Sequence, residues 1–310
     1  MILQRADENT ICAALLCTGL GCEKETGHLT AKGFNNLIRI LYMSKIYEPS
    51  QLVYMSESDI YGLKGISEET AECVYNLTRH FEQAANKAEQ LYTSGIAIIG
   101  IDSSRYSEKF LRCLPYSAPG VFYVYGNDTL LLKDMISVTG LRHPSEKGAE
   151  FAKKCGKNIA EKGFCLVSGG AIGCDSIAHT SCIKYGGNAV VFPAVPLFNA
   201  LQNSEIVRLC DGGKMCLVSD LNPEAAFSKS AILRRNKYIY ISAKLSFVCE
   251  SGISKGGTFR GALECLEKQY TPVFIGDGDG LFAEPTLLKN GAEKCEMSAI
   301  DDVICAKFDV

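Results

Sequence analysis

Short apolar runs alternate with helix-length polar and apolar stretches along this chain, and this alternation limits the folds that it can adopt. The runs are nearly continuous in apolar residues, as expected for strands that are buried on both faces. Strands of this kind that alternate with helices predict an α/β fold with a doubly wound, mostly parallel sheet. The expected strands are residues 96–100, 121–125, 135–140, 165–169, 189–194, 215–220, 245–250 and 272–276.

The first third of the chain has a different pattern. Residues 1–92 show helical spacing of apolar residues and no clear alternating strand. Within them, residues 62–71 resemble the hairpin of a helix-hairpin-helix unit, with Ser67 as a helix cap. Such a hairpin can hold a DNA phosphate on backbone N–H groups, but the pattern favours a plain connection in a small helical bundle. We expect a small all-helical domain over residues 1–92 and the sheet domain over 93–310.

Composition and charge exclude several classes of protein. Hydrophobic residues make up 47% and charged residues 22% of the chain, which is ordinary for a globular protein and excludes a disordered one. The net charge of −3 excludes a chain that is basic as a whole, although it allows a basic patch. No apolar run approaches the ~18–20 residues of a membrane helix, and the N-terminus lacks a secretory pattern. We therefore expect a cytoplasmic protein.

The fifteen cysteines include no Cys-x-x-Cys pair and match no zinc pattern, and most stand in apolar runs. Free cysteine in such runs behaves as a small buried hydrophobic residue. We expect core packing in a reducing compartment, with no metal and no cofactor.

Three expected strands are followed by glycine-rich segments, at residues 140–144, 168–175 and 250–258. Ligands of open α/β sheets bind beyond the carboxyl ends of the strands, and glycine followed by a helix N-terminus lets backbone N–H groups approach a phosphate. The pattern predicts an anion site, although the glycines also suit tight turns and Arg142 also suits a structural ion pair. The candidate residues are Arg142, Ser168, Gly169, Gly170, Gly173, Lys255, Gly256, Gly257 and Thr258.

These loops lack the spacing of a dinucleotide fingerprint, the Gly-Lys-Ser/Thr of a P-loop and a Gly-x-Ser-x-Gly elbow. Asp175 and His179 lie four residues apart on one helix face, which suits a catalytic pair but more simply a cap and a hydrogen-bonded packing histidine. Glu250 suits either a ligand contact or a partner for a helix cap.

The expected helix at residues 231–242 concentrates positive charge and tyrosines, and residues 228–229 precede it. Cations and aromatic rings together are typical of a groove for single-stranded nucleic acid. The alternative is a solvated helix face with its tyrosines packed inward. The candidate residues here are Arg234, Arg235, Asn236 and Lys237.

Several of these segments resemble the DNA-processing protein A family (DprA, also called Smf) in order and approximate spacing. The resemblance rests on Gly140-Leu-Arg, the Ser-Gly-Gly-Ala-Ile-Gly-Cys-Asp string from Ser168 to Asp175 with His179, Arg235-Asn-Lys, and Glu250 with its glycine loop. It implies an extended Rossmann-like domain and, at the N-terminus, a sterile-alpha-motif-like domain. It also implies a protein that binds single-stranded DNA, forms a homodimer and helps to load the RecA recombinase in natural transformation.

The chain also departs from the family pattern. Lys237 stands where the family has an arginine, Ile232-Leu233 replace Phe-Pro, and the loop at residues 255–258 aligns uncertainly. The printed sequence ends where the Rossmann-like domain closes, so we expect a divergent member without the C-terminal winged helix.

Two other functions suit the same strand-end pocket. One is a nucleotide sensor, for example in phage defence. The other is a phosphoribohydrolase like the lysine-decarboxylase-like (LOG) proteins. Residues 255–258 of this chain faintly resemble the glycine loop of those proteins, but Glu264 lies too far along the chain to match their catalytic glutamate. We expect a binding protein and not an enzyme.

Overall fold

The computed structural model describes residues 4–23, 27–226, 229–253 and 255–308. Ser228 and the side chain of Lys229, which precede the basic helix, lie outside the described residues. The chain divides into two compact units: unit 1 holds Met1–Asp128 with Ser219–Ala225, and unit 2 holds Thr129–Val218 with Ala226–Val310.

Unit 1 is mainly helical. Its central helix α1 has a fully apolar core segment, with Leu15 and Leu16 completely buried. Ser56 forms a capping box with Asp59. Ser67 caps the next helix through the backbone N–H of Thr70, which confirms the expected helix cap. The elements are α1 (Glu8–Thr18), α2 (Ala31–Met43), η1 (Pro49–Tyr54), α3 (Glu57–Tyr61), α4 (Glu68–Thr78), α5 (Phe81–Thr93), β1 (Ile96–Gly100), α6 (Glu108–Cys113) and β2 (Val121–Gly126).

The strands β1 and β2 pair antiparallel, with Ile98 opposite Tyr123, and cluster with the helices of unit 1. The chain passes from helices to strands between α5 and β1, close to residue 92, whereas the compact units divide after Asp128.

Unit 2 is a parallel sheet in the order β6-β5-β4-β3-β7-β8-β9. The strands are β3 (Met135–Thr139), β4 (Cys165–Ser168), β5 (Asn188–Val191), β6 (Met215–Ser219), β7 (Leu245–Val248), β8 (Val273–Gly276) and β9 (Glu293–Cys295). The helices are η2 (Asp128–Leu132), which begins at the last residue of unit 1, α7 (Glu146–Glu161), α8 (Cys174–Lys184), α9 (Leu197–Ala200), α10 (Ser204–Asp211), α11 (Lys229–Ser242), α12 (Gly257–Glu267), α13 (Pro285–Lys289), η3 (Met297–Ala299) and α14 (Ile300–Phe308).

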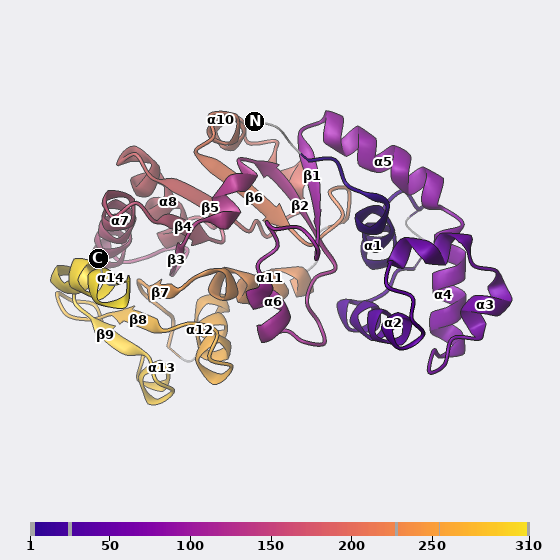
Figure 1. The fold of residues 1–310 in the computed structure, drawn as a ribbon. Coiled ribbons are helices and arrows are strands. Elements are labelled where there is room, and N and C mark those ends of the chain that lie inside the picture. Colours follow the sequence, from indigo (N-terminus) through magenta and orange to yellow (C-terminus); the bar gives the residue numbers. More distant parts are fainter. Residues whose placement is uncertain (1–3, 24–26, 227–228, 254, 309–310) are drawn as a thin grey trace. The chain divides into compact units, whose positions relative to one another are not determined.

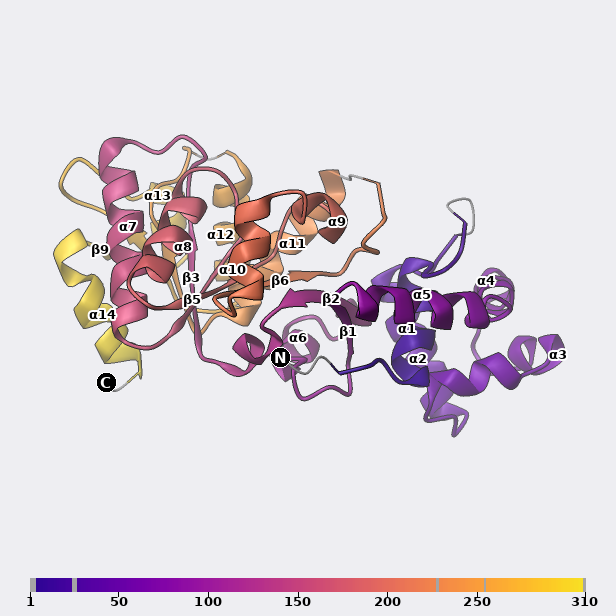
Figure 2. The same cartoon turned by 90° about the horizontal axis from the view of Figure 1, so that it is seen from above.

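Helices cover both faces of this sheet (Figures 1 and 2). One core joins β3, β4, β7 and β8 to α7, α8 and α14, and it includes Phe151, Cys174 and Phe247. Helices α11 and α12 contact each other on the opposite face. The predicted doubly wound parallel sheet is therefore confirmed.

The chain runs outward from β3 through β4, β5 and β6, and then returns as β7 on the other side of β3. This reversal creates a switch point between β3 and β7, where Thr139 lies opposite Val248. The carboxyl ends of strands at such a point are the usual ligand site of an open α/β sheet.

The expected strands agree with the structure within a few residues. β5 ends at Val191 and not at residue 194, and Pro193, which has no backbone N–H, follows closely. The short edge strand β9 was not predicted, because Glu293 and Lys294 are exposed and give no apolar run. Among the described residues, no helix is long and apolar enough to cross a membrane.

Candidate functional site at the switch point

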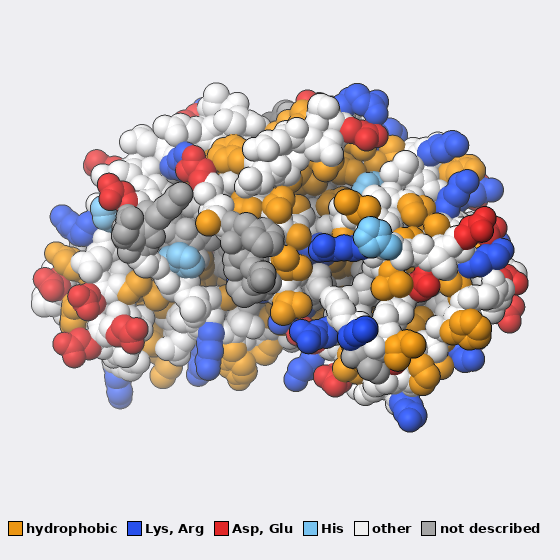
Figure 3. Space-filling view, turned by 180° about the vertical axis from the view of Figure 1, so that it is seen from behind, with side chains coloured by type: hydrophobic (Ala, Val, Ile, Leu, Met, Phe, Trp, Pro, Cys, Tyr) orange, Lys and Arg blue, Asp and Glu red, His pale blue; other side chains and the backbone are white. Residues whose placement is uncertain are grey.

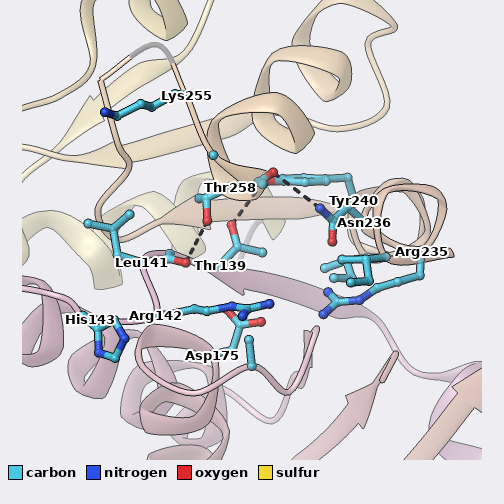
Figure 4. A pocket seen from close by; sticks show the side chains of 16 residues that line it. Thr139, Leu141, Arg142, His143, Asp175, Arg235, Asn236, Tyr240, Lys255 and Thr258 are labelled. Carbon is cyan, nitrogen blue, oxygen red and sulfur yellow. Dashed lines mark hydrogen bonds between the residues drawn. The ribbon is translucent and has the colours of Figure 1, made fainter. Parts of the chain in front are cut away.

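A pocket of about 520 Å³ lies at the carboxyl ends of β3 and β7 in unit 2. The loop after β3, the start of α8, the inner side of α11 and the loop that leads into α12 line it (Figure 4). All four of the segments that the sequence singled out therefore contribute to one site.

Three cationic side chains line the pocket. Arg142 follows β3 and is exposed, and Lys255 is exposed in the loop before α12. Arg235 on α11 is only 8% exposed. Figure 4 shows Arg142 and Arg235 reaching toward one another from opposite sides, with Asp175 close to both. Burial lowers the pKa of Arg235, Asp175 raises it, and Arg142 lowers it further, which shows that the two cations repel each other.

Asp175, in the first turn of α8, is the only carboxylate among the described residues that line this pocket. Its Oδ2 accepts a hydrogen bond from the backbone N–H of Gly169 at 2.9 Å. Burial raises the pKa of Asp175 to about 6, although Arg235 and the backbone N–H groups lower it. The carboxylate therefore holds the glycine loop and offsets the buried arginine. The favoured interpretation as a helix cap is wrong, because the N-cap residue of α8 is Gly173 and no side chain caps this helix.

Arg235 is bound to the same glycine loop. Its Nη2 donates to the carbonyl oxygen of Gly169 at 3.1 Å, while its buried Nε has no hydrogen-bond partner among the described residues. A Cβ on Gly169 would collide with this guanidinium group. There is thus room for the guanidinium group only because residue 169 has no side chain.

The other glycines have distinct roles. Gly173 has a φ of 94°, and a Cβ there would collide with the carbonyl oxygens of Leu141 and Arg142. Gly173 thus shapes the loop that carries Arg142. At Gly257, the first residue of α12, a Cβ would meet only Asn236 Nδ2 at 3.7 Å, so this backbone faces open space.

Hydrogen bonds tie the pocket walls together. Thr258 Oγ1 donates to the carbonyl oxygen of Gly140 at 2.7 Å, and Asn236 Nδ2 donates to that of Gly257 at 3.4 Å. The hydroxyls of Thr139 and Tyr240 share a hydrogen bond of 3.1 Å. Asn236 and Thr258 therefore line the pocket and also position α11 and α12.

Eight expected site residues are not among the described residues that line this pocket. Gly169, Gly170 and His179 line a second pocket, and Gly173 precedes α8. The other four are Lys237, Arg234, Glu250 and Ser168. Lys237 pairs with Glu264 at 3.0 Å, and neither it nor Arg234 is among the described residues that line the pocket. Glu250 Oε2 accepts from the backbone N–H of Ser145 at 2.8 Å, at the start of α7. The Ser168 side chain is buried, and its Oγ accepts from Gly170 N at 3.3 Å.

A second, mostly apolar pocket of about 280 Å³ adjoins the first, sharing Arg142, Ala171 and Arg235 with it. Gly170 and His179 line this second pocket. Burial lowers the pKa of His179 to about 4, and its Nδ1 has no hydrogen-bond partner among the described residues. Asp175 and His179 thus line different pockets, and the expected hydrogen bond of the packing histidine is not found at Nδ1 among the described residues.

Some pocket residues were missed by the sequence analysis. They are Thr139, Leu141, His143, Ala171, Ile232, Ile239 and Tyr240. His143 directly follows Arg142 and could have been inferred from this neighbour. Tyr240 lies five residues beyond Arg235, about 140° further around the helix, so the spacing alone does not indicate it.

The hairpin of unit 1 does connect two helices, α3 and α4, through a turn at Gly65. Desolvation raises the pKa of Tyr61, and the nearby charges of Glu72, Glu57 and Glu68 raise it further, so glutamates lie close to the hairpin. Because these carboxylates repel phosphate, the geometry favours a structural connection here.

The face in Figure 3 carries basic and acidic side chains interspersed with hydrophobic ones. Unlike the acidic hairpin, the pocket of unit 2 brings several cations to one place. It is therefore the stronger candidate for an anion.

Comparison with known proteins identifies the family. The family model for DNA recombination-mediator protein A matches residues 94–304, most of the chain. The chain belongs to this family. The expected resemblance is confirmed, and the match takes in the sheet and every residue of the pocket.

Individual relatives agree with this assignment. The chain is 29% identical to the DNA processing protein DprA of Bacillus subtilis over 216 residues, 64% of this chain and 71% of that protein. It is 27% identical to DprA of Streptococcus pneumoniae over 175 residues, 50% of this chain and 61% of that protein.

Solved structures share the fold. The X-ray structure of Streptococcus pneumoniae DprA matches with a TM-score of 0.67 at 20% identity, over 94% of this chain and 95% of that one. Helicobacter pylori DprA, whose structure is described in terms of a unique single-stranded DNA binding mode, matches with a TM-score of 0.56 at 17% identity, over 68% of this chain and 96% of that one.

Proposed function

We propose that this protein binds single-stranded DNA through phosphate contacts in the switch-point pocket, and that it acts in DNA processing during natural transformation. The observation that carries the proposal is the convergence of Arg142, Arg235 and Lys255 on one pocket that holds a single carboxylate, Asp175. A phosphodiester there would meet charge-assisted hydrogen bonds from the arginines. The open N-terminal turn of α12 at Gly257 adds backbone N–H groups to the same site.

The size of the pocket favours a single strand. A volume of about 520 Å³ is that of a small-ligand site, too small for a duplex to enter. A single strand is flexible enough to bend one phosphate and its sugar into such a recess. Its bases then remain outside the pocket, so binding should vary little with sequence.

Family membership supports the wider role. The relatives are DNA processing proteins, and one of them is described as binding single-stranded DNA. We extend the proposal to a homodimer that helps to load the RecA recombinase, as the family resemblance implies. We propose a binding protein without turnover.

Anisotropy of a labelled oligo-dT of about 20–30 nucleotides tests the proposal, with duplex DNA and AMP as competitors. Because binding through phosphates releases counterions, the affinity should fall steeply between two salt concentrations. Duplex DNA should compete poorly. Absence of binding at low salt, or full displacement by millimolar AMP, contradicts the proposal.

One observation favours a second candidate, a site for a mononucleotide. The basic pocket adjoins the apolar pocket of about 280 Å³, and together they would suit a phosphate and a base. Tight AMP binding without release of adenine would indicate a sensor, and release of adenine a phosphoribohydrolase. Glu264 pairs with Lys237 and accepts from Tyr270 at 3.3 Å, which gives it no place among the described lining residues.

A further inference from the structure

The most exposed large apolar side chains of unit 2, among the described residues, stand at one edge of its sheet. Phe282 is 89% exposed, Ile253 80% and Ile172 76%. They lie in the loops that follow β8, β7 and β4 respectively. Because parallel strands end at the same edge, all three belong to the edge that carries the basic pocket.

Contacts hold these loops beside the pocket. Glu250, just after β7, binds Ser145 at the end of the loop that carries Arg142. Leu281 joins the core that contains Cys249, and a Cβ on Gly276 would touch both residues. The loop before Phe282 therefore packs on the strand end that leads into the pocket wall.

The loop of Phe282 is built to expose this ring. Its neighbours Leu281 and Ala283 are buried, and Asp277 Oδ1 accepts from the backbone N–H of Ala283 at 3.0 Å. An isolated bridge joins Gly278 to Leu281. Because both neighbours are fixed inward, the side chain between them is held in solvent.

Cations stand next to the apolar side chains. Lys147 pairs with Glu150 at 3.1 Å, which raises the pKa of the lysine, and Asp279 raises it further. The Cγ of Lys147 lies 3.8 Å from a Cβ placed on Gly280, so this lysine borders the Phe282 loop. Lys255 lies two residues beyond Ile253. Alternating cations and exposed apolar groups are what a single strand requires, with phosphates on the cations and bases on the apolar surfaces.

We propose that Phe282 stacks on a base of the strand whose phosphate lies in the pocket, with Ile253 as an apolar contact beside it. This inference rests on the proposed function. It adds a contact to a base, whereas the pocket itself contacts the phosphate. The partner surface is the π-face of a base, so the contact is independent of sequence.

The absence of tryptophan from the chain supplies a direct test. Phe282→Trp introduces a single tryptophan, and Tyr185→Trp places the control tryptophan at the far end of α8, away from the pocket edge. Each variant is titrated with oligo-dT and with an abasic strand of equal length, while anisotropy of the labelled strand reports binding. The affinity of Phe282→Ala for both strands is measured in parallel.

Stacking predicts that oligo-dT quenches the emission of Phe282→Trp, that the abasic strand binds without quenching it, and that neither strand changes Tyr185→Trp. Phe282→Ala should weaken oligo-dT binding about tenfold and leave abasic binding unchanged. Three results would overturn the stacking contact. Oligo-dT binds Phe282→Trp without changing its emission, both strands quench that emission equally, or the emission changes when the protein is diluted without DNA. Absence of binding to the unmodified protein instead overturns the proposed function, and this inference with it.

Discussion

Asp175 and Arg235 bind opposite sides of one residue: the carboxylate accepts the N–H of Gly169 at 2.9 Å, and the guanidinium group donates to its carbonyl oxygen at 3.1 Å. The charges compensate each other in a buried place, and the loop after β4 is fixed between α8 and α11. The pocket thus obtains a preorganised positive charge without a mobile side chain.

Arg142→Ala should weaken oligo-dT binding by about 5- to 30-fold. The slope of log affinity against log salt concentration should fall by the amount expected for about one lost phosphate contact. Arg142 is exposed and lines the pocket, so its loss should leave stability unchanged. Lys237→Ala is a matched control on the neighbouring helix, since Lys237 pairs with Glu264. Equal losses for both variants would contradict the assignment of the pocket.

Arg235→Ala should destabilise unit 2 by about 3–5 kcal/mol, because it leaves Asp175 as an uncompensated buried carboxylate. Urea denaturation measures this change. The double variant Arg235→Met with Asp175→Asn should recover much of the stability but not the affinity for DNA. A single Arg235→Ala variant as stable as the parent would refute the compensation.

The pH dependence of binding should reflect Asp175. Its pKa of about 6 means that the carboxylate is largely charged at pH 7.5 and largely neutral at pH 5. Since a negative charge in the pocket repels phosphate, affinity for oligo-dT should rise several-fold as the pH falls across this range. Asp175→Asn keeps an oxygen for the Gly169 N–H and should remove the rise.

This measurement needs a His143→Gln background, which removes the histidine that lines the pocket. The other titratable lining side chains are the arginines, Lys255 and Tyr240, and burial raises the pKa of Tyr240 well above this range. A pH profile that persists unchanged in His143→Gln with Asp175→Asn would assign the titration to a different group.

Gly173→Ala should destabilise the protein by about 2–4 kcal/mol, because the methyl group meets two carbonyl oxygens at a φ of 94°. Gly257→Ala is the matched control, since its Cβ would meet only Asn236 at 3.7 Å. Thermal unfolding of both variants checks the difference. Similar melting temperatures would show that the loop of Arg142 can move to accommodate the added methyl group.

Much of the site was accessible to sequence reasoning. Arg142 and Lys255 follow strands that are buried on both faces, and such strands end at a common edge whatever their neighbours are. The role of Glu250 could not be decided from the sequence, because a ligand contact and a partner for a helix cap need the same residue type. The structure shows Glu250 bound to the backbone of Ser145.

By itself, the sequence determined the alternation of buried strands and helices, the glycine turns at their carboxyl ends and the helix that carries four consecutive polar residues from Arg234 to Lys237. Only the tertiary structure decided which of these face the ligand site. Residues 235 and 237 are about 200° apart around a helix, so they point to opposite sides. Because α11 packs against the loop of Gly169, Arg235 points inward and bonds that loop. Because α11 also packs against α12, Lys237 forms an ion pair with Glu264.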